Sequence, residues 1–304
     1  MAKYYREIIN AAAKTAPDIF VSQCDDNYRA SISTCVNLIL DKSKKIILLA
    51  GPSSSGKTTT AKMIVNGLEK KGCAAYLVSL DDFYIADREQ YPRNKDGSID
   101  YESPDALDIK LIGKCFNDLM KNGGSDLPIF DFNTHSRSER KNSIRLDDDS
   151  LIVVEGIHGL NPRITAGLSK DKIAKIYVSV SSRVYTRDND LVFTRRDLRL
   201  MRRMVRDYYF RSTSVDETLD NWQKVCNGEN KFIFPFRNHA DFKLDSFHPC
   251  EVGIISPIVS ELFASAGDGA HTDEKNDFIK KIRLFESIDK NMISDESLLR
   301  EFVV

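Results

Sequence analysis

Short apolar runs alternate along the chain with stretches in which apolar residues recur at helical spacing. Five runs have the length of a strand: residues 45–50, 75–80, 151–154, 176–180 and 242–244. Residues 151–154 (LIVV) are apolar throughout, which is typical of a strand buried on both faces of a parallel sheet. Apolar periodicity predicts helices at residues 57–71, 106–122 and 190–211, and another that ends near residue 263. This alternation predicts an α/β fold, a parallel sheet flanked by helices.

The two ends of the chain have a weaker pattern. Residues 3–14 and 26–40 are amphipathic, so we expect residues 1–44 to form a helical extension before a main domain at residues 45–266. Residues 267–272 have the composition of a linker, and residues 277–285 have a weak helical pattern. We therefore expect residues 267–304 to form a weakly helical tail.

Composition narrows the functional classes. The formal net charge is −1, so the chain has no general attraction to nucleic acid or to an anionic membrane. The six cysteines are scattered, without the spacing of a zinc site, and fit neutral thiols in a reducing compartment. No apolar run is long enough for a signal peptide or a bilayer span. We expect a cytoplasmic protein with a small-molecule substrate. The sequence leaves its oligomeric state open, a homo-oligomer included.

The most specific motif joins the first predicted strand to the helix after it. Residues 51–58 (GPSSSGKT) match GxxxxGK[ST] at every fixed position. Glycines let the backbone curl so that successive N–H groups point at phosphate oxygens, and the helix start adds a favourable field. Lys57 is expected to reach the β- and γ-phosphates, and the Thr58 hydroxyl to ligate Mg²⁺. The expected nucleotide contacts in this phosphate loop are Gly51, Ser53, Ser54, Ser55, Gly56, Lys57, Thr58 and Thr59.

Other motifs decide which nucleotide-binding class the loop belongs to. GTPases need an NKxD base-reading motif, and residues 94–97 (NKDG) have the wrong spacing for it. The LSGGQ-like signature of transporter ATPases is absent too. A small-molecule kinase that uses Mg²⁺ with ATP, or with GTP, remains, and a Gly/Ser-rich turn without a ligand is the structural alternative.

Acidic residues follow two of the predicted strands. Asp81 and Asp82 come after residues 75–80, and Glu155 comes after residues 151–154. Because ligands of open α/β sheets bind at the carboxyl ends of the strands, these residues should lie near the phosphate loop. A kinase needs one acidic group near the metal and another that accepts the proton of the attacking hydroxyl. Asp81 is our candidate base, Glu155 a candidate metal ligand, and Asp82 a local cap or turn residue.

Arginines gather on the helix predicted at residues 190–211. The set is Arg195, Arg199, Arg202, Arg203, Arg206 and Arg211. Four of them recur at spacings of four, three and four, which places those four on one helical face. One interpretation is a lid whose cations close over a triphosphate. The other is a solvated face paired with nearby aspartates, namely Asp188, Asp190, Asp197 and Asp207.

Five segments together resemble the uridine kinase family, within the group that includes phosphoribulokinase and pantothenate kinase. They are residues 81–84 (DDFY), 103–108 (SPDALD), 128–137 (PIFDFNTHSR), 155–157 (EGI) and 202–207 (RRMVRD). The resemblance extends over roughly residues 45–244. It implies a P-loop kinase fold with an arginine-rich helical lid. It also implies phosphorylation of a small-molecule hydroxyl, with uridine or cytidine as the acceptor that fits the family best.

The same resemblance implies roles for individual residues. Asp81 is the base, Lys57, Glu155 and Arg206 complete the catalytic set, and Arg203 and Arg211 contact the nucleotide. The implied acceptor contacts are Asp81, Tyr84, Tyr101, Glu102, Phe130, Phe132, His135 and Arg203. Aromatic stacking and one hydrogen-bonding imidazole suit a planar base. Taken alone, the two phenylalanines could equally be core residues and His135 a surface histidine.

Three residues depart from the family pattern. Glu102 stands where aspartate is usual, Phe130 where tyrosine is common, and Thr213 where a second lid arginine is common. These departures concern the acceptor, whereas the phosphotransfer motifs are kept. A kinase of another hydroxyl compound, such as a sugar phosphate or a pantothenate-like acid, stays possible. A regulatory module that binds a nucleotide without chemistry is the third alternative.

Further segments resemble longer bacterial nucleoside kinases that carry an N-terminal domain related to threonyl-tRNA synthetase. These segments are residues 87–93, 155–162, 228–241 and 298–302. The residues before the first predicted strand are too few to contain a domain of that kind. We therefore expect a stand-alone relative or a trimmed one.

Overall fold

A five-stranded parallel sheet forms the centre of the computed structural model, which describes residues 2–41, 44–132, 134–147, 149–267 and 269–303. Its strand order is β12-β9-β2-β8-β3, and all of its pairs are parallel. The strands are β2 (Ile46–Ala50), β3 (Ala75–Ser79), β8 (Leu151–Glu155), β9 (Ile173–Ser179) and β12 (Phe242–Asp245). Every residue of β2 and β8 is buried. The predicted α/β fold is confirmed.

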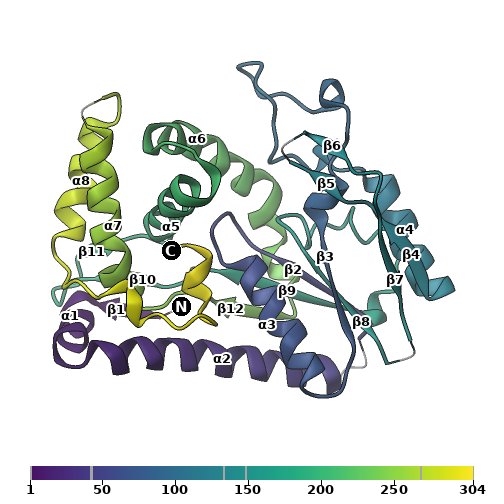
Figure 1. Cartoon of the computed structure of the whole chain (residues 1–304), viewed down its shortest axis with the longest axis horizontal. Coiled ribbons are helices and arrows are strands. Elements are labelled where there is room, and N and C mark those ends of the chain that lie inside the picture. The colour runs from purple at the N-terminus through teal and green to yellow at the C-terminus, as the bar shows by residue number, and fades with distance from the viewer. Residues whose placement is uncertain (1, 42–43, 133, 148, 268, 304) are drawn as a thin grey trace.

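Helices cover both faces of the sheet (Figure 1). On one face, Ile47 and Leu49 of β2 share a core with residues of α2 (Pro17–Asp41), α3 (Lys57–Glu69) and α7 (Glu251–Ala266). On the other face, Ile46 and Leu48 pack with α4 (Ile109–Asn122). This division follows from strand geometry, since alternate side chains point to opposite faces. None of the helices in the described ranges combines the length and the apolar content that crossing a bilayer requires.

The N-terminal region begins differently from the prediction. Residues 3–14 start with a short strand, β1 (Lys3–Tyr5), before α1 (Arg6–Thr15). The next helix, α2, begins at Pro17 instead of residue 26, because proline is well accommodated in the first turn of a helix. β1 pairs with β10 (Arg183–Tyr185), which pairs with β11 (Leu191–Phe193), and these three strands form a second, small sheet.

The arginine-rich helix, α5 (Arg195–Arg211), starts later than the predicted residue 190. Thr194 caps it, because its hydroxyl accepts a hydrogen bond from the Asp197 N–H at 3.1 Å and the Asp197 carboxylate accepts one from the Thr194 N–H at 2.8 Å. Leu191, inside the predicted helix, lies instead in β11 and is half exposed. Tyr208 of α5 is also half exposed, so it does not belong to the buried apolar face of this helix.

Several elements were not predicted. Two short hairpins pair β4 (Gly124–Leu127) with β7 (Asn142–Arg145) and β5 (Phe130–Asp131) with β6 (Ser136–Arg137). A further helix, α6 (Val215–Gly228), follows α5. The helix expected from residue 106 begins at Ile109, where the Asp108 side chain accepts a hydrogen bond from the Leu111 N–H. Strands this short carry too few residues for a period of two to be visible in the sequence.

The C-terminal residues fold back onto the core. After α8 (Thr272–Ile282), the chain returns beside α3 and α2, where its last turn lies in the middle of the molecule (Figure 1). Leu298, Leu299 and Phe302 are fully buried in the same apolar core as α2 and α3. The last residues are therefore part of the packed structure that surrounds the start of α3.

Candidate active site

The phosphate loop joins β2 to α3 at the centre of the sheet. A Cβ atom at Gly51 would lie 2.0 Å from the Val178 carbonyl oxygen, so the close passage of the loop over β9 requires glycine. Gly56 begins α3 with a φ of 81°, a conformation that glycine adopts without strain. Among the described residues, the buried hydroxyls of Ser54 and Ser55 have no hydrogen-bond partner. Such hydroxyls, together with the backbone N–H groups at a helix start, suit an anionic ligand.

Two arginines of α5 and the nearby Glu229 form hydrogen bonds with Ser53 of this loop. The Arg203 guanidinium donates a hydrogen bond to Ser53 Oγ at 2.7 Å, and Arg199 donates one to the Ser53 carbonyl at 2.9 Å. The Ser53 N–H donates to a Glu229 carboxylate oxygen at 3.3 Å. Lys57 Nζ turns back over the loop and donates to the Pro52 carbonyl at 3.2 Å. The arginine-rich helix therefore contacts the phosphate loop directly.

Asp81 follows β3 in the short turn Leu80–Phe83. Its carboxyl is accessible to solvent but is surrounded by protein, and desolvation raises its pKa. The charges of Lys57 and Arg211 act in the opposite direction and lower this pKa, which places both cations near the carboxyl. The neighbouring Asp82 accepts a hydrogen bond from the Phe130 N–H at 3.1 Å, which agrees with a local structural role.

Glu155 ends β8 and lies in the same group of charges. Its Oε1 accepts a hydrogen bond from the Ser79 hydroxyl at 3.0 Å. Desolvation and the Asp81 charge raise the pKa of Glu155 to about 7, against the opposing effects of Lys57 and Ser79. Thr58 is exposed at the start of α3. Carboxylate and hydroxyl oxygens are the ligands that Mg²⁺ prefers, so the chemistry of these two residues fits a magnesium ion.

The six arginines do not act as one set. Arg199 and Arg202 are buried and paired with Glu229 and Glu251, the second pair at 2.5 Å. Arg203, Arg206 and Arg211 lie around the buried Asp207, at 3.0, 2.7 and 3.6 Å. Arg199 and Arg202 therefore fit neither interpretation of the sequence. They do not form a solvated face paired with aspartates, and their buried ion pairs with glutamates keep them from closing over a triphosphate. Their function is to fasten α5 to the elements around it.

Aromatic side chains surround Tyr84, three residues after Asp81. The ring of Tyr84 lies 6.0 Å from Tyr91, 6.5 Å from Tyr101, 5.8 Å from Phe130 and 6.0 Å from Phe132, between ring centroids. Phe130 is buried, whereas half of Phe132 is exposed. Desolvation and the Asp81 charge raise the pKa of Tyr84, so this aromatic cluster adjoins the candidate base.

His135 lies at the edge of the same cluster. Its ring Nε2 is 3.0 Å from a guanidinium nitrogen of Arg88, which also donates to the Tyr101 hydroxyl at 3.0 Å. The structure therefore brings the expected acceptor contacts Tyr84, Tyr101, Phe130, Phe132 and His135 into one neighbourhood. Their roles in binding stay predictions.

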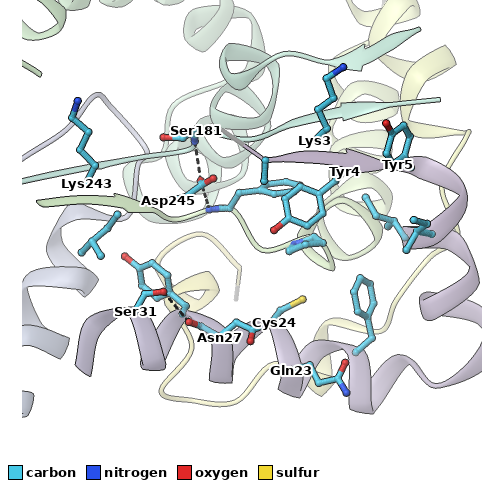
Figure 2. A pocket seen from close by; sticks show the side chains of 18 residues that line it. Lys3, Tyr4, Tyr5, Gln23, Cys24, Asn27, Ser31, Ser181, Lys243 and Asp245 are labelled. Atoms are coloured by element: carbon cyan, nitrogen blue, oxygen red, sulfur yellow. Dashed lines mark hydrogen bonds between the residues drawn. The ribbon is translucent and has the colours of Figure 1, made fainter. Parts of the chain in front are cut away.

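Two cavities of similar volume lie elsewhere among the described residues. One of about 730 Å³ adjoins Pro52 of the phosphate loop, and its cationic lining residues are Arg183, Arg195, Arg196, Arg199, Arg237 and Lys243. The other, of about 720 Å³, lies between β1, α1 and α2 on one side and β12 on the other (Figure 2). There, Asp245 accepts a hydrogen bond from the Ser181 N–H at 2.8 Å. This second cavity contains no residue of the phosphate loop and none of the expected site residues.

Comparison with known proteins assigns the family. A sequence model described as the Phosphoribulokinase / Uridine kinase family matches residues 46–252. The chain belongs to this family. A uridine kinase of Lactobacillus helveticus is 30% identical over 197 residues, which cover 64% of this chain and 83% of that protein. A uridine kinase of Saccharomyces cerevisiae is 29% identical over 255 residues, which cover 76% of this chain and 46% of that protein.

Structural comparison agrees on the fold. A solved structure described as a fructose transport system kinase from Silicibacter sp. TM1040 has a TM-score of 0.51 and 16% identity. It covers 70% of this chain and 98% of that chain. At this identity the likeness concerns the fold alone. Membership of the phosphoribulokinase/uridine kinase family makes the chain a phosphotransferase that acts on a hydroxyl group of a small molecule.

Two residues with buried polar atoms stand out beside the candidate site. Glu102 has a buried carboxylate oxygen without a hydrogen-bond partner, and desolvation raises its pKa to about 7. His158 is 2% exposed, and neither ring nitrogen makes a hydrogen bond of normal geometry among the described residues. Desolvation lowers the pKa of His158 to about 4, and the backbone of Glu102, which lies near the ring, opposes this shift. Buried polar groups are normally satisfied, so these two are suited to contact a polar ligand.

Sequence analysis selected Glu102 but missed His158. The signal was available, since His158 follows Glu155 and Gly156 in a segment already recognised at the end of β8. Glu229, which pairs with Arg199, and Glu301, which contacts Thr59, were also missed. No local pattern marks these two, because their partners lie 30 and 242 residues away.

Proposed function

We propose that this kinase transfers the γ-phosphoryl group of ATP to the 5′-hydroxyl of a pyrimidine nucleoside, uridine or cytidine. The position of Asp81 carries the proposal. Desolvation raises the pKa of Asp81, and the charge of Lys57 in the phosphate loop lowers it. Besides desolvation, the charge of Asp81 raises the pKa of Tyr84 in the aromatic cluster. One acidic group thus lies between a site suited to phosphates and a site suited to a planar ring.

The residues divide into three tasks in this mechanism. Lys57 and the backbone N–H groups of the phosphate loop hold the transferred phosphate and neutralise its charge. Arg203 and Arg206 add positive charge from α5. Asp81 accepts the proton of the attacking hydroxyl, and its raised pKa makes it a better base than an ordinary aspartate. Tyr84 and Phe132 stack on the base of the nucleoside and so orient its hydroxyl.

Magnesium, when bound, supplies positive charge that stabilises the phosphates during transfer. Thr58 and Glu155 would hold it, because a hydroxyl and a carboxylate oxygen match its preference. In the described ranges, no group of three or more His, Cys, Asp or Glu side chains is arranged to hold a metal ion. Mg²⁺ at kinase sites is commonly bound by one or two carboxylates together with substrate phosphates, and the two candidate ligands fit that arrangement.

The unpartnered groups of Glu102 and His158 support an acceptor with several hydroxyls. A ribose offers hydroxyls that both donate and accept, and either residue could pair with one of them. A sugar or sugar phosphate has hydroxyls as well, so these two residues alone do not favour a nucleoside. The aromatic cluster does favour it, since stacking suits a flat base.

The test is ADP release in the presence of Mg²⁺ and ATP with a panel of acceptors. Uridine, cytidine, adenosine, fructose, ribulose 5-phosphate and pantothenate cover the alternatives. We expect release with uridine or cytidine and little with the others. The Asp81→Asn variant is the control for chemistry, because it keeps the shape of the side chain and removes the base.

Each other outcome points to a different assignment. Release with fructose, ribulose 5-phosphate or pantothenate alone would replace the nucleoside by that acceptor. ATP binding without release for any acceptor would favour a regulatory module. Equal release by the wild type and by Asp81→Asn would remove Asp81 from its role as the base.

A further inference from the structure

The C-terminal segment places a carboxylate on the phosphate loop. Glu301 Oε2 accepts a hydrogen bond from the Thr59 N–H at 3.1 Å and another from the Thr59 hydroxyl at 2.7 Å. Thr59 is the third residue of α3, so its N–H is one of the donors that a helix leaves unpaired at its start. A carboxylate from 242 residues further along the chain therefore occupies an anion position at the helix start.

This position is one that a bound nucleotide is expected to use. The N–H groups at the start of the helix after a phosphate loop cradle the phosphates of the nucleotide. Thr59 stands directly after Lys57 and Thr58, the residues expected to reach the terminal phosphates and the metal. Glu301 and a phosphate oxygen cannot both accept the same N–H and hydroxyl at these distances.

Apolar contacts hold the segment in place. A Cβ atom at Gly56 would lie 2.7 Å from the Leu298 side chain, so Leu298 packs directly on the loop. Phe302 is fully buried, with the Arg202 guanidinium 4.9 Å from its ring centroid. The Ser297 hydroxyl donates to Asp25 of α2 at 2.5 Å. Glu301 itself is only partly buried, so its side chain can rotate away while its neighbours stay docked.

The charge of Glu301 also acts on the rest of the site. It is among the charges that raise the pKa of Glu155, together with Asp81. Three carboxylates, from Asp81, Glu155 and Glu301, therefore lie around Lys57 and the loop. A third negative charge at this place opposes the arrival of a polyphosphate.

We propose that Glu301 is a further residue of the nucleotide site, which occupies a phosphate position in the nucleotide-free chain and is displaced when a nucleotide binds. The proposal rests on nucleotide binding at the phosphate loop, which belongs to the proposed function. Its effect is a lower apparent affinity, since only the fraction of molecules with Glu301 rotated away can bind.

A binding titration with ATP and Mg²⁺ tests this role. The Glu301→Gln variant keeps the size of the side chain and removes its charge, and Glu301→Ala removes the contact altogether. Because hydrogen bonds to a charged group are stronger than neutral ones, we expect both variants to bind ATP about tenfold more tightly than the wild type. Glu296→Gln is the matched control, since Glu296 is an exposed acid of the same segment, and it should bind ATP as the wild type does.

A purely structural role predicts the opposite result. If Glu301 only caps α3, its replacement lowers the melting temperature and leaves ATP affinity equal or weaker, and that outcome overturns the proposal. Equal tightening by Glu296→Gln would also overturn it, because the effect would then be one of general charge. If neither the wild type nor any variant binds ATP, and Lys57→Ala behaves in the same way, nucleotide binding itself fails and the proposed function falls with it.

Discussion

Replacing Glu155 by glutamine is expected to remove a pH-dependent destabilisation of the nucleotide-free protein. Glu155 is 7% exposed at the end of β8. Desolvation and the Asp81 charge raise its pKa from 4.5 to about 7. The folded chain therefore holds a proton on this carboxyl at pH values where the unfolded chain has released it.

The sign and size of the effect follow from this difference. The stabilisation of the folded protein that comes from protonated Glu155 is fully present below pH 4.5 and is lost as the pH rises through about 7. Between about pH 5.5 and pH 8 the wild type should lose about 2 kcal/mol of unfolding free energy at this residue. Glutamine is neutral at both pH values, and its carbonyl can still accept the hydrogen bond from the Ser79 hydroxyl. The variant should therefore gain about 2 kcal/mol relative to the wild type over the same interval.

Urea unfolding at the two pH values, without nucleotide or Mg²⁺, measures this difference. The exposed Glu139 offers a matched control, because Glu139→Gln makes the same change in charge at the surface. Glu102→Gln should repeat the result, since desolvation also raises the pKa of Glu102 to about 7. A difference between wild type and Glu155→Gln that is the same at both pH values would refute the desolvation argument.

Further substitutions test the site and the core. Asp81→Asn should lower kcat about 100-fold or more and leave ATP binding nearly intact, as measured by steady-state kinetics and titration, because only the base is lost. Phe132→Ala should raise the KM for the nucleoside about tenfold, since a stacking ring is worth roughly 1–3 kcal/mol. It should change stability little, because Phe132 is half exposed. Phe130→Ala should also lower the melting temperature, because Phe130 is buried. Glu251→Gln should cost about 3–5 kcal/mol in urea unfolding, because it leaves the buried charge of Arg202 unpaired.

Controls separate these effects from general damage. The ion pair between Arg163 and Asp105 is about half exposed at both ends, so Asp105→Asn should cost at most about 1 kcal/mol. An equal cost for Asp105→Asn and Glu251→Gln would contradict the burial argument. A large loss of ATP binding in Asp81→Asn would show that Asp81 organises the phosphate loop instead of acting as a base.

The sequence by itself determined the elements whose signals are local. The strands β2, β3 and β8 and the loop at residues 51–58 were predicted because a fully apolar run and a glycine-rich motif need only neighbouring residues to be recognised. The positions of Asp81 and Glu155 followed as well, since the carboxyl ends of parallel strands meet at one edge.

Only the tertiary structure decided which partner each charged residue found. Helical spacing placed Arg199 and Arg203 on α5, but it could not tell that Arg199 is buried against Glu229 while Arg203 reaches Ser53. The contact of Glu301 with Thr59 joins residues 242 positions apart. Periodicity reports which side of an element is apolar, whereas the pairing of charges depends on which elements pack together. That packing is set by the core as a whole.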